Sequence, residues 1–196
     1  MKKFEITAVL EEACRQTLLC RMFLKADPNC YSCFPIKAGE DLFLYMDEQD
    51  FRLDGYVVRR LKDIVEINSK QDLTSEILES EGVTASVEKI DIDISSWEKA
   101  LSYLSKHRLN AIFESEDRNS GNIDYVIGRV EKIDDRYLYV RAFDYDGKWE
   151  EKPTRIAFSE LVSISFGTRY VEIFTKYLPP CPVERDISLL PKSPNE

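Results

Sequence analysis

The chain has 196 residues, of which 43% are hydrophobic and 32% are charged. These proportions are ordinary for a globular protein and exclude a wholly disordered chain or a coiled coil, while the length suits one large domain or two small ones. The formal net charge of −9 opposes non-specific binding to DNA or RNA, because nucleic acids are polyanions.

The start of the chain has the basic residues of a secretion signal but lacks its apolar core. Met1-Lys2-Lys3-Phe4 is followed by Glu5, Glu11 and Glu12. No run of 18 apolar residues occurs, so we expect no membrane-spanning helix and a cytoplasmic protein. An odd number of cysteines without a secretion signal favours reduced thiols over a disulfide framework. The five are Cys14, Cys20, Cys30, Cys33 and Cys181.

The N-terminal section predicts one helix followed by short strands. Apolar residues recur at helical spacing over residues 6–17, with Glu11, Glu12 and Arg15 on the opposite side. Turn signals such as Asp27-Pro28-Asn29 and Gly55 then separate five extended runs. The expected strands are Leu18–Leu24, Cys33–Lys37, Leu42–Met46, Tyr56–Arg60 and Ile64–Ile67.

The middle section predicts two helices around one strand. Residues 72–82 form a short helix that ends at glycine, and Val87–Ile94 alternates apolar and charged residues as a half-exposed strand does. Ser95 and Glu98 have the spacing of a capping box, which starts a helix that runs to about His107.

The third section is again rich in strands and closes with a helix. Asp146-Gly147 reads as a hairpin turn, apolar residues recur at helical spacing from Arg169, and Pro179-Pro180 stops that helix. The remaining residues, 179–196, are expected to be an extended or disordered proline-rich tail. The expected strands are Leu109–Glu114, Asp124–Ile133, Tyr137–Phe143, Thr154–Phe158 and Val162–Phe166.

Two of these sections resemble each other. The run 61–67 lines up with 158–164 at an offset of 97 residues, and 44–46 lines up with 138–140 at an offset of 94. A period near 95 residues is too long for a solenoid and suits a duplicated small domain. The alternative is coincidence, because alternating apolar strands look alike by construction.

The repeated unit resembles a known family of small barrels. A helix, five short strands and the final run Leu61-Lys62-Asp63-Ile64-Val65-Glu66-Ile67 are similar to the Sm-like barrel and to related barrels such as the WYL domain. In the second copy, Gly128-Arg129-Val130 stands where Sm-like proteins bend their second strand. Residues 5–178 also resemble uncharacterised bacterial proteins in which a helical linker joins two such barrels.

This resemblance implies an α+β, mainly β protein made of two five-stranded Sm-like barrels. The expected domains are a barrel with its leading helix (1–68), a helix–strand–helix linker (69–107), a barrel with its closing helix (108–178) and the tail (179–196). The family's RNA-contact signatures, Asp-x-x-x-Asn and Arg-Gly, do not occur, and neither copy has a Trp-Tyr-Leu run. RNA binding is therefore not carried over.

No motif completes a catalytic or metal site. Cys30 and Cys33 precede an extended run rather than a helix, which disfavours redox chemistry, and Cys14 and Cys20 are too far apart in sequence for a second zinc-binding pair. Asp144 starts a calcium-like run whose twelfth residue is Arg155, not glutamate. We expect no enzyme activity, no cofactor and no metal, although whether the four N-terminal cysteines converge stays open.

The carboxylates and the one histidine have ordinary explanations. Glu114, Glu116 and Asp117 are expected to be solvated acids beside turns, and His107 to be a favourable charge at the end of a helix. The densest basic run, 59–62, is bracketed by Asp54 and Asp63, which weakens a phosphate-binding interpretation.

One strand offers a binding surface. Alternation places Leu138, Val140 and Ala142 inward and gives the other side an aromatic and basic row, which the helix over 169–178, the other barrel or a partner must cover. The row is Tyr137, Tyr139, Arg141 and Phe143. We therefore expect a non-catalytic module that binds a protein or ligand, or self-associates, and no membrane partner. The alternative, by analogy of fold, is a nucleic-acid or nucleotide-sensing regulator, which the charge disfavours.

Overall fold

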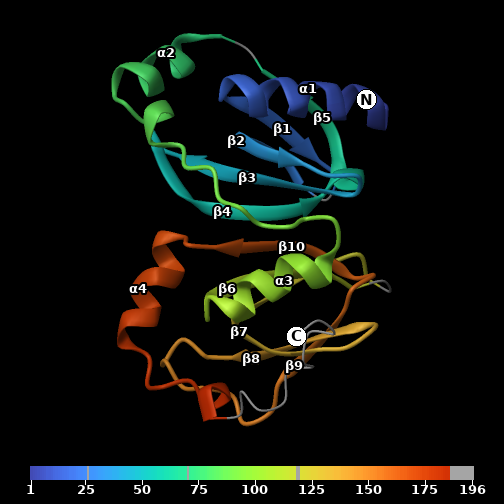
Figure 1. Cartoon of the computed structure of the whole chain (residues 1–196), viewed down its shortest axis with the longest axis vertical. Coiled ribbons are helices and arrows are strands. Elements are labelled where there is room, and N and C mark those ends of the chain that lie inside the picture. The colour runs from blue at the N-terminus through green and yellow to red at the C-terminus, as the bar shows by residue number, and fades with distance from the viewer. Residues whose placement is uncertain (26, 70, 118–119, 186–196) are drawn as a thin grey trace, which may run out of the picture.

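The computed structural model describes residues 1–25, 27–69, 71–117 and 120–185, and most of the tail, 186–196, lies outside the described residues. It shows one antiparallel sheet of ten strands in the order β5-β1-β2-β3-β4-β10-β6-β7-β8-β9 (Figure 1). The ten strands predicted for the N-terminal and third sections each correspond to one strand of this sheet. The strands are β1 (Cys20–Leu24), β2 (Asp27–Ala38), β3 (Leu42–Gln49), β4 (Arg52–Arg60), β5 (Ile64–Asn68), β6 (Asn110–Glu116), β7 (Ile123–Ile133), β8 (Tyr137–Ala142), β9 (Thr154–Ala157) and β10 (Leu161–Phe166).

The expectation of two separate five-stranded barrels was wrong. A five-stranded barrel closes when its first and last edges pair with each other. Here the free edge of β4 pairs instead with β10 from the other half of the chain, with Val58 opposite Ile164 and Arg59 opposite Ser163. This pairing, which we call the seam, makes the two halves into one open sheet.

The two halves nevertheless have the same strand order. The sequence β10-β6-β7-β8-β9 is β5-β1-β2-β3-β4 with every number raised by five. The upper part of Figure 1 holds β1–β5 and the lower part holds β6–β10, with β4 and β10 side by side between them.

In the N-terminal half, the predicted first helix covers one side of the sheet. Helix α1 (Lys3–Gln16) buries Ile6, Leu10 and Ala13 at helical spacing. They pack with inward residues of the strands, among them Phe43 and Tyr45 of β3. The expected turn at Asp27-Pro28-Asn29 was wrong, because β2 already begins at Asp27.

In the C-terminal half, helix α3 (Trp97–Lys106) has the corresponding role. Its buried residues Ala100, Leu101 and Leu104 belong to the cluster that contains Leu138 and Val140 of β8. The N-cap is Ser96 rather than Ser95, because the Ser96 hydroxyl accepts the N–H of Lys99. The predicted last helix is α4 (Arg169–Tyr177), which is followed by a 3₁₀ turn at Pro182–Arg185.

Residues 71–109, which the structure describes, contain no strand, so the strand predicted over Val87–Ile94 was wrong. After helix α2 (Leu73–Ser80) and the 3₁₀ turn Thr84–Ser86, the chain runs without strand pairing across β2–β4. Lys37 Nζ donates to the Ile92 carbonyl at 2.8 Å, and the side chains of Ile92 and Ile94 are buried. The alternating pattern therefore reports burial on one side of a single chain rather than a strand in a sheet.

Candidate functional site

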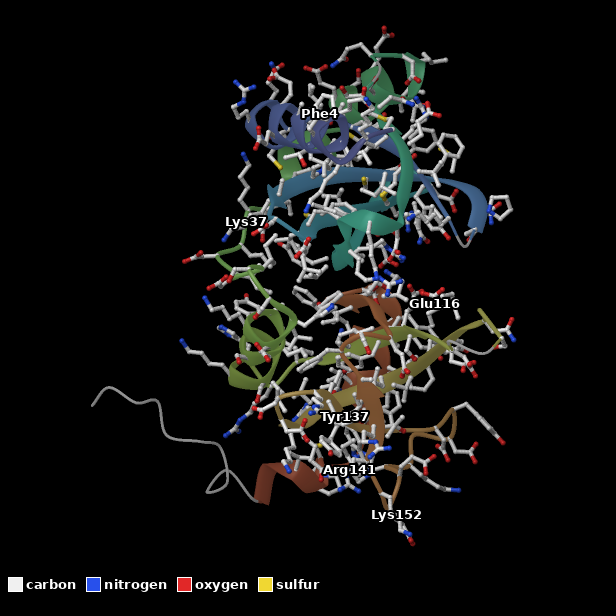
Figure 2. The ribbon with its side chains drawn as sticks, turned by 90° about the vertical axis from the view of Figure 1, so that its right-hand side faces the viewer. Phe4, Lys37, Glu116, Tyr137, Arg141 and Lys152 are labelled. Atoms are coloured by element: carbon white, nitrogen blue, oxygen red, sulfur yellow. The ribbon has the colours of Figure 1, made fainter. Side chains whose placement is uncertain are left out.

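Three residues of the predicted aromatic and basic row lie on β8, and the fourth, Phe143, follows directly after its end. Tyr137, Tyr139 and Arg141 are partly exposed, whereas Phe143 is only 8% exposed. Phe143 packs against Trp149 and against Phe174 of α4, with ring centroids 5.4 and 5.9 Å apart. We call these four residues the β8 surface; Figure 2 shows its members Tyr137 and Arg141 in the half that lies beyond the seam from α1. Among the described contacts, α4 therefore covers the Phe143 end.

Arg141 is held in a fixed position. Its Nε lies 2.6 Å from a carboxylate oxygen of Glu131 on β7, and its Nη1 donates to the carbonyl oxygens of Glu150 and Glu151. A guanidinium fixed by several acceptors loses little conformational freedom when a partner contacts its plane. Arg141 is thus held in one orientation by Glu131 and by the carbonyl groups of Glu150 and Glu151.

The two tyrosines carry cations over their rings. Arg155 of β9 lies 4.6 Å from the centre of the Tyr137 ring, and Lys132 of β7 lies 5.3 Å from that of Tyr139. The Tyr139 hydroxyl donates to Asp134 at 3.0 Å, and this hydrogen bond raises the pKa of Tyr139 above its usual value. The β8 surface is therefore amphipathic, with exposed positive charges over its aromatic rings.

The matching surface of the N-terminal half has a different character. The strand pairing matches β3 to β8 at an offset of 95 residues, one more than the sequence pattern indicated, because Phe34 pairs with Met46 as Arg129 pairs with Arg141. This offset takes the inward residues Phe43 and Tyr45 to Leu138 and Val140. The same offset takes the outward residues Leu42, Leu44 and Met46, all buried, to Tyr137, Tyr139 and Arg141. We call the first three the β3 surface. The hydrogen bonds of Lys37 to Ile92 and of Tyr56 to the Glu88 carbonyl hold the linker on this side of the sheet.

The seam contains ion pairs that the sequence interpretation did not anticipate. Arg59 of β4 donates to Glu114 of β6 at 2.9 Å, and the Ser163 hydroxyl of β10 donates to the same carboxylate. The neighbouring Arg60 pairs with Glu116 at 3.1 Å and also with Asp63. Glu114 is therefore a strand residue that neutralises the basic run rather than a free acid beside a turn. The side chain of Glu116, the last residue of β6, is 46% exposed as expected but pairs with Arg60, and it lies between the halves in Figure 2.

Replacing Asp47 with asparagine should stabilise the protein at neutral pH. Burial raises the pKa of Asp47 to about 6, so the folded state favours the protonated form. Its stabilising contribution is complete below the unfolded pKa near 3.8 and is lost as the pH rises through 6. Asp47→Asn should raise the free energy of unfolding at pH 7.5 by about 1 kcal/mol, after allowance for partial solvent access. Urea unfolding at pH 7.5 and 4 tests this.

The control for that measurement is Asp50→Asn at an exposed position in the β3–β4 turn. The gain from Asp47→Asn should shrink at pH 4, whereas the control should change little at either pH. A gain that is equal at the two pH values would show that the asparagine acts through packing rather than through the buried charge.

The cysteines do not assemble into a site among the described residues. Cys20 and Cys33 face each other across β1 and β2 and are buried beneath α1. Burial raises the pKa of Cys20 to about 12, which keeps it a thiol. Cys30 is exposed, and no group of three or more potential metal-ligating side chains gathers within the described ranges.

His107 is the C-cap of α3, where its ring packs on Tyr103 with centroids 4.3 Å apart.

The described surface includes two open depressions beside α1, of about 560 and 370 Å³. The first is lined by Lys3, Phe4, Thr7, Ala8 and Glu11. Neither encloses a small molecule in the manner of a ligand pocket.

Comparisons of the chain with protein-family models, with curated proteins and with solved structures gave no match. Within the described part of the chain, no helix combines the length and the apolar character needed to cross a membrane.

Proposed function

We propose that this protein is a non-catalytic interaction module that binds a protein partner on the β8 surface. The observation that carries the proposal is the difference between matching positions in the two halves. Leu42, Leu44 and Met46 are buried, whereas their counterparts Tyr137, Tyr139 and Arg141 are partly exposed. The linker of the same chain lies against Leu42, Leu44 and Met46. Tyr137, Tyr139 and Arg141 occupy the matching positions, so another chain can lie against them in the same way.

The residue types of the β8 surface suit a reversible contact. Tyrosine and arginine tolerate water when a partner is absent and bury large areas when it is present. Such residues also supply much of the binding energy in protein interfaces. Leucine and methionine, which occupy the β3 surface, suit permanent burial instead.

We further propose that the halves are copies of one duplicated unit. The shared strand order supports this, as do the helices, since an offset of 91 residues takes Leu10 and Ala13 of α1 to Leu101 and Leu104 of α3. The relation to the Sm-like family stays a prediction that rests on the sequence pattern.

The alternative proposal is binding of single-stranded nucleic acid. It is favoured by the cations of Arg155 and Lys132 over the rings of Tyr137 and Tyr139, since aromatic and basic side chains together bind bases and phosphates. The net charge of −9 opposes it. Failure to bind single-stranded RNA at low salt, where electrostatic attraction is least screened, would exclude it.

Photo-crosslinking from the β8 surface should capture a protein. The photoreactive residue p-benzoylphenylalanine is placed at Tyr139 in the full chain, which is then irradiated in cells of the source organism. We expect an adduct heavier than the 22.8 kDa chain that protease removes and nuclease does not. The adduct should weaken severalfold when Arg141→Glu is added, because Arg141 lies beside Tyr139 on the same surface.

The control places the same photoreactive residue at Tyr145, which is 86% exposed in the hairpin turn beyond β8. An adduct of equal yield at Tyr145 would show random collision and would contradict the proposal. A nuclease-sensitive adduct at Tyr139 would favour the nucleic-acid alternative.

A further inference from the structure

The sheet ends in two edges that match the two strands of the seam. β5 and β9 are the outermost strands of the ten-stranded order, whereas β4 and β10 are paired at its centre. Raising the strand number by five takes β4 to β9 and β5 to β10. The edge β9 is therefore the counterpart of β4, and the edge β5 is the counterpart of β10.

The two counterparts keep the same register along the strand. An offset of 97 residues takes Val58 to Arg155 and, in the other direction, takes Ile164 to Ile67. The pairing within each half agrees with this match, provided that β3 is matched to β8 at an offset of 95: β3 pairs Phe43 with Arg59, and β8 pairs Leu138 with Ile156. The seam thus specifies one register for β9 against β5, in which Arg155 lies opposite Ile67.

The backbone groups of both edges point in the direction that this pairing needs. The Met1 amino group donates to the Val65 carbonyl at 2.8 Å, and Ile67 N–H contacts Met1 Sδ at 3.4 Å, so both residues of β5 face away from β1. Phe158 N–H bonds to the Arg136 carbonyl at 2.9 Å, and alternation then turns Arg155 away from β8. Arg155 and Ile67 therefore both have backbone groups directed outward. On β5, Met1 occupies the Val65 carbonyl and the Ile67 N–H, so a pairing strand must displace Met1 from this edge.

Apolar side chains are exposed beside the β5 edge. Val65 is 46% exposed, whereas its counterpart beside the seam, Val162, is 3% exposed. Phe23 lies opposite Glu66 and is 36% exposed, and its counterpart is Glu114, which the seam engages through Arg59. The apolar side chains beside β5 are thus exposed at positions where the matching residues beside β10 are buried or paired in the seam.

We propose that the protein partner is a second copy of this chain, whose β5 edge pairs with β9 in the register of the seam. The inference rests on the proposed function, because it names the protein that binds the β8 surface. The second copy would pair with β9, the edge strand next to β8, and so lie beside that surface. Because β9 meets β5 rather than another β9, the contact is head-to-tail. Each added copy leaves one β5 edge and one β9 edge free at the ends of the assembly. Further copies can therefore bind until the assembly closes into a ring or grows into a filament.

Disulfide trapping tests the register. In this pairing, Thr154 lies opposite Asn68 of the next copy as a pair without mutual hydrogen bonds, whose Cα atoms are about 4.5 Å apart and within reach of a disulfide. Thr154→Cys and Asn68→Cys are prepared as two separate proteins, each with the exposed Cys30 replaced by serine. After oxidation, the mixture should give a species of twice 22.8 kDa, and each protein alone should stay monomeric on a non-reducing gel.

The matched control mixes Arg155→Cys with Asn68→Cys, because adjacent residues of a strand point to opposite faces of the sheet. We expect at least tenfold less crosslink from this mixture. Crosslinking of Asn68→Cys alone would indicate β5 against β5 and would overturn the head-to-tail arrangement, as would equal yields in the two mixtures.

Light scattering separates this inference from the proposed function. The mass of the wild-type protein should rise above 22.8 kDa as its concentration increases. Glu66→Lys on the β5 edge should reduce this rise, whereas the control Glu79→Lys, on the exposed side of α2, should leave it unchanged. A strict monomer without crosslinks would overturn self-association. Capture of a different protein from Tyr139 would then still support the interaction function.

Discussion

Replacing Gly128 with alanine should unfold the C-terminal half of the sheet. A Cβ at this position would lie 2.1 Å from the Arg141 carbonyl oxygen and 2.7 Å from the Ala142 Cα. Both are backbone atoms of β8, which pairs with β7 on one side and with β9 on the other, so neither can move without breaking strand pairing. We expect a loss of about 3 kcal/mol or more in the free energy of unfolding.

Urea unfolding followed by tryptophan fluorescence measures this loss. Trp97 begins α3 and Trp149 packs on Phe143, so both tryptophans report on the C-terminal half. The control is Gly121→Ala, which has φ +71° but no atom within 4 Å of the added Cβ, and it should cost only about 1 kcal/mol. Equal effects of the two substitutions would show that the close approach of β7 to β8 is not what requires glycine.

Replacing Arg59 with alanine should have a similarly large effect, this time on the seam. The substitution leaves the Glu114 carboxylate without its cation and removes a buried side chain between the halves. Arg59 is buried, whereas Glu114 is 32% exposed and keeps the Ser163 hydroxyl as a donor, so the loss should be about 2 to 3 kcal/mol, at the low end for a buried ion pair. The midpoint of urea unfolding should fall accordingly.

A double variant distinguishes the charge from the packing. Arg59→Met with Glu114→Gln removes both charges and keeps much of the volume, so it should recover most of the loss. Recovery is helped because the buried Arg59 Nε has no hydrogen-bond partner among the described residues, which is a desolvation cost that methionine removes. If the double variant were as unstable as Arg59→Ala, the ion pair would not be what stabilises the seam.

The alternation of apolar and polar residues was sufficient to predict the ten strands of the sheet. It did not predict which strands pair between the two halves. Alternation in Tyr137–Phe143 reports which residues face the core, because burial acts on each residue separately. Whether β4 closes on its own half or pairs with β10 depends on groups more than 100 residues away, since Val58 lies opposite Ile164. Val87–Ile94 shows the same limit, because a segment that crosses a sheet and a strand within one can have the same pattern.

The candidate site was predictable to a similar degree. The row on β8 followed from alternation and from residue type. The ion pairs of the seam were missed because Glu114 and Glu116 look like ordinary surface acids when their partners are unknown. Glu114 and Glu116 are two residues apart on β6, and Arg59 and Arg60 are adjacent at the end of β4. These pairs of opposite charge would have predicted the ion pairs if β4 and β6 had been expected to lie close together.

The position of β10 has a consequence for the order in which the protein can fold. This strand is the last of the ten to be synthesised, yet it lies at the centre of the sheet between β4 and β6. Until residue 166 has left the ribosome, β4 and β6 both present open edges, and a nascent chain with two open edges is exposed to mispairing with its neighbours. The mature fold removes both hazards in one step, when a single six-residue strand inserts between them.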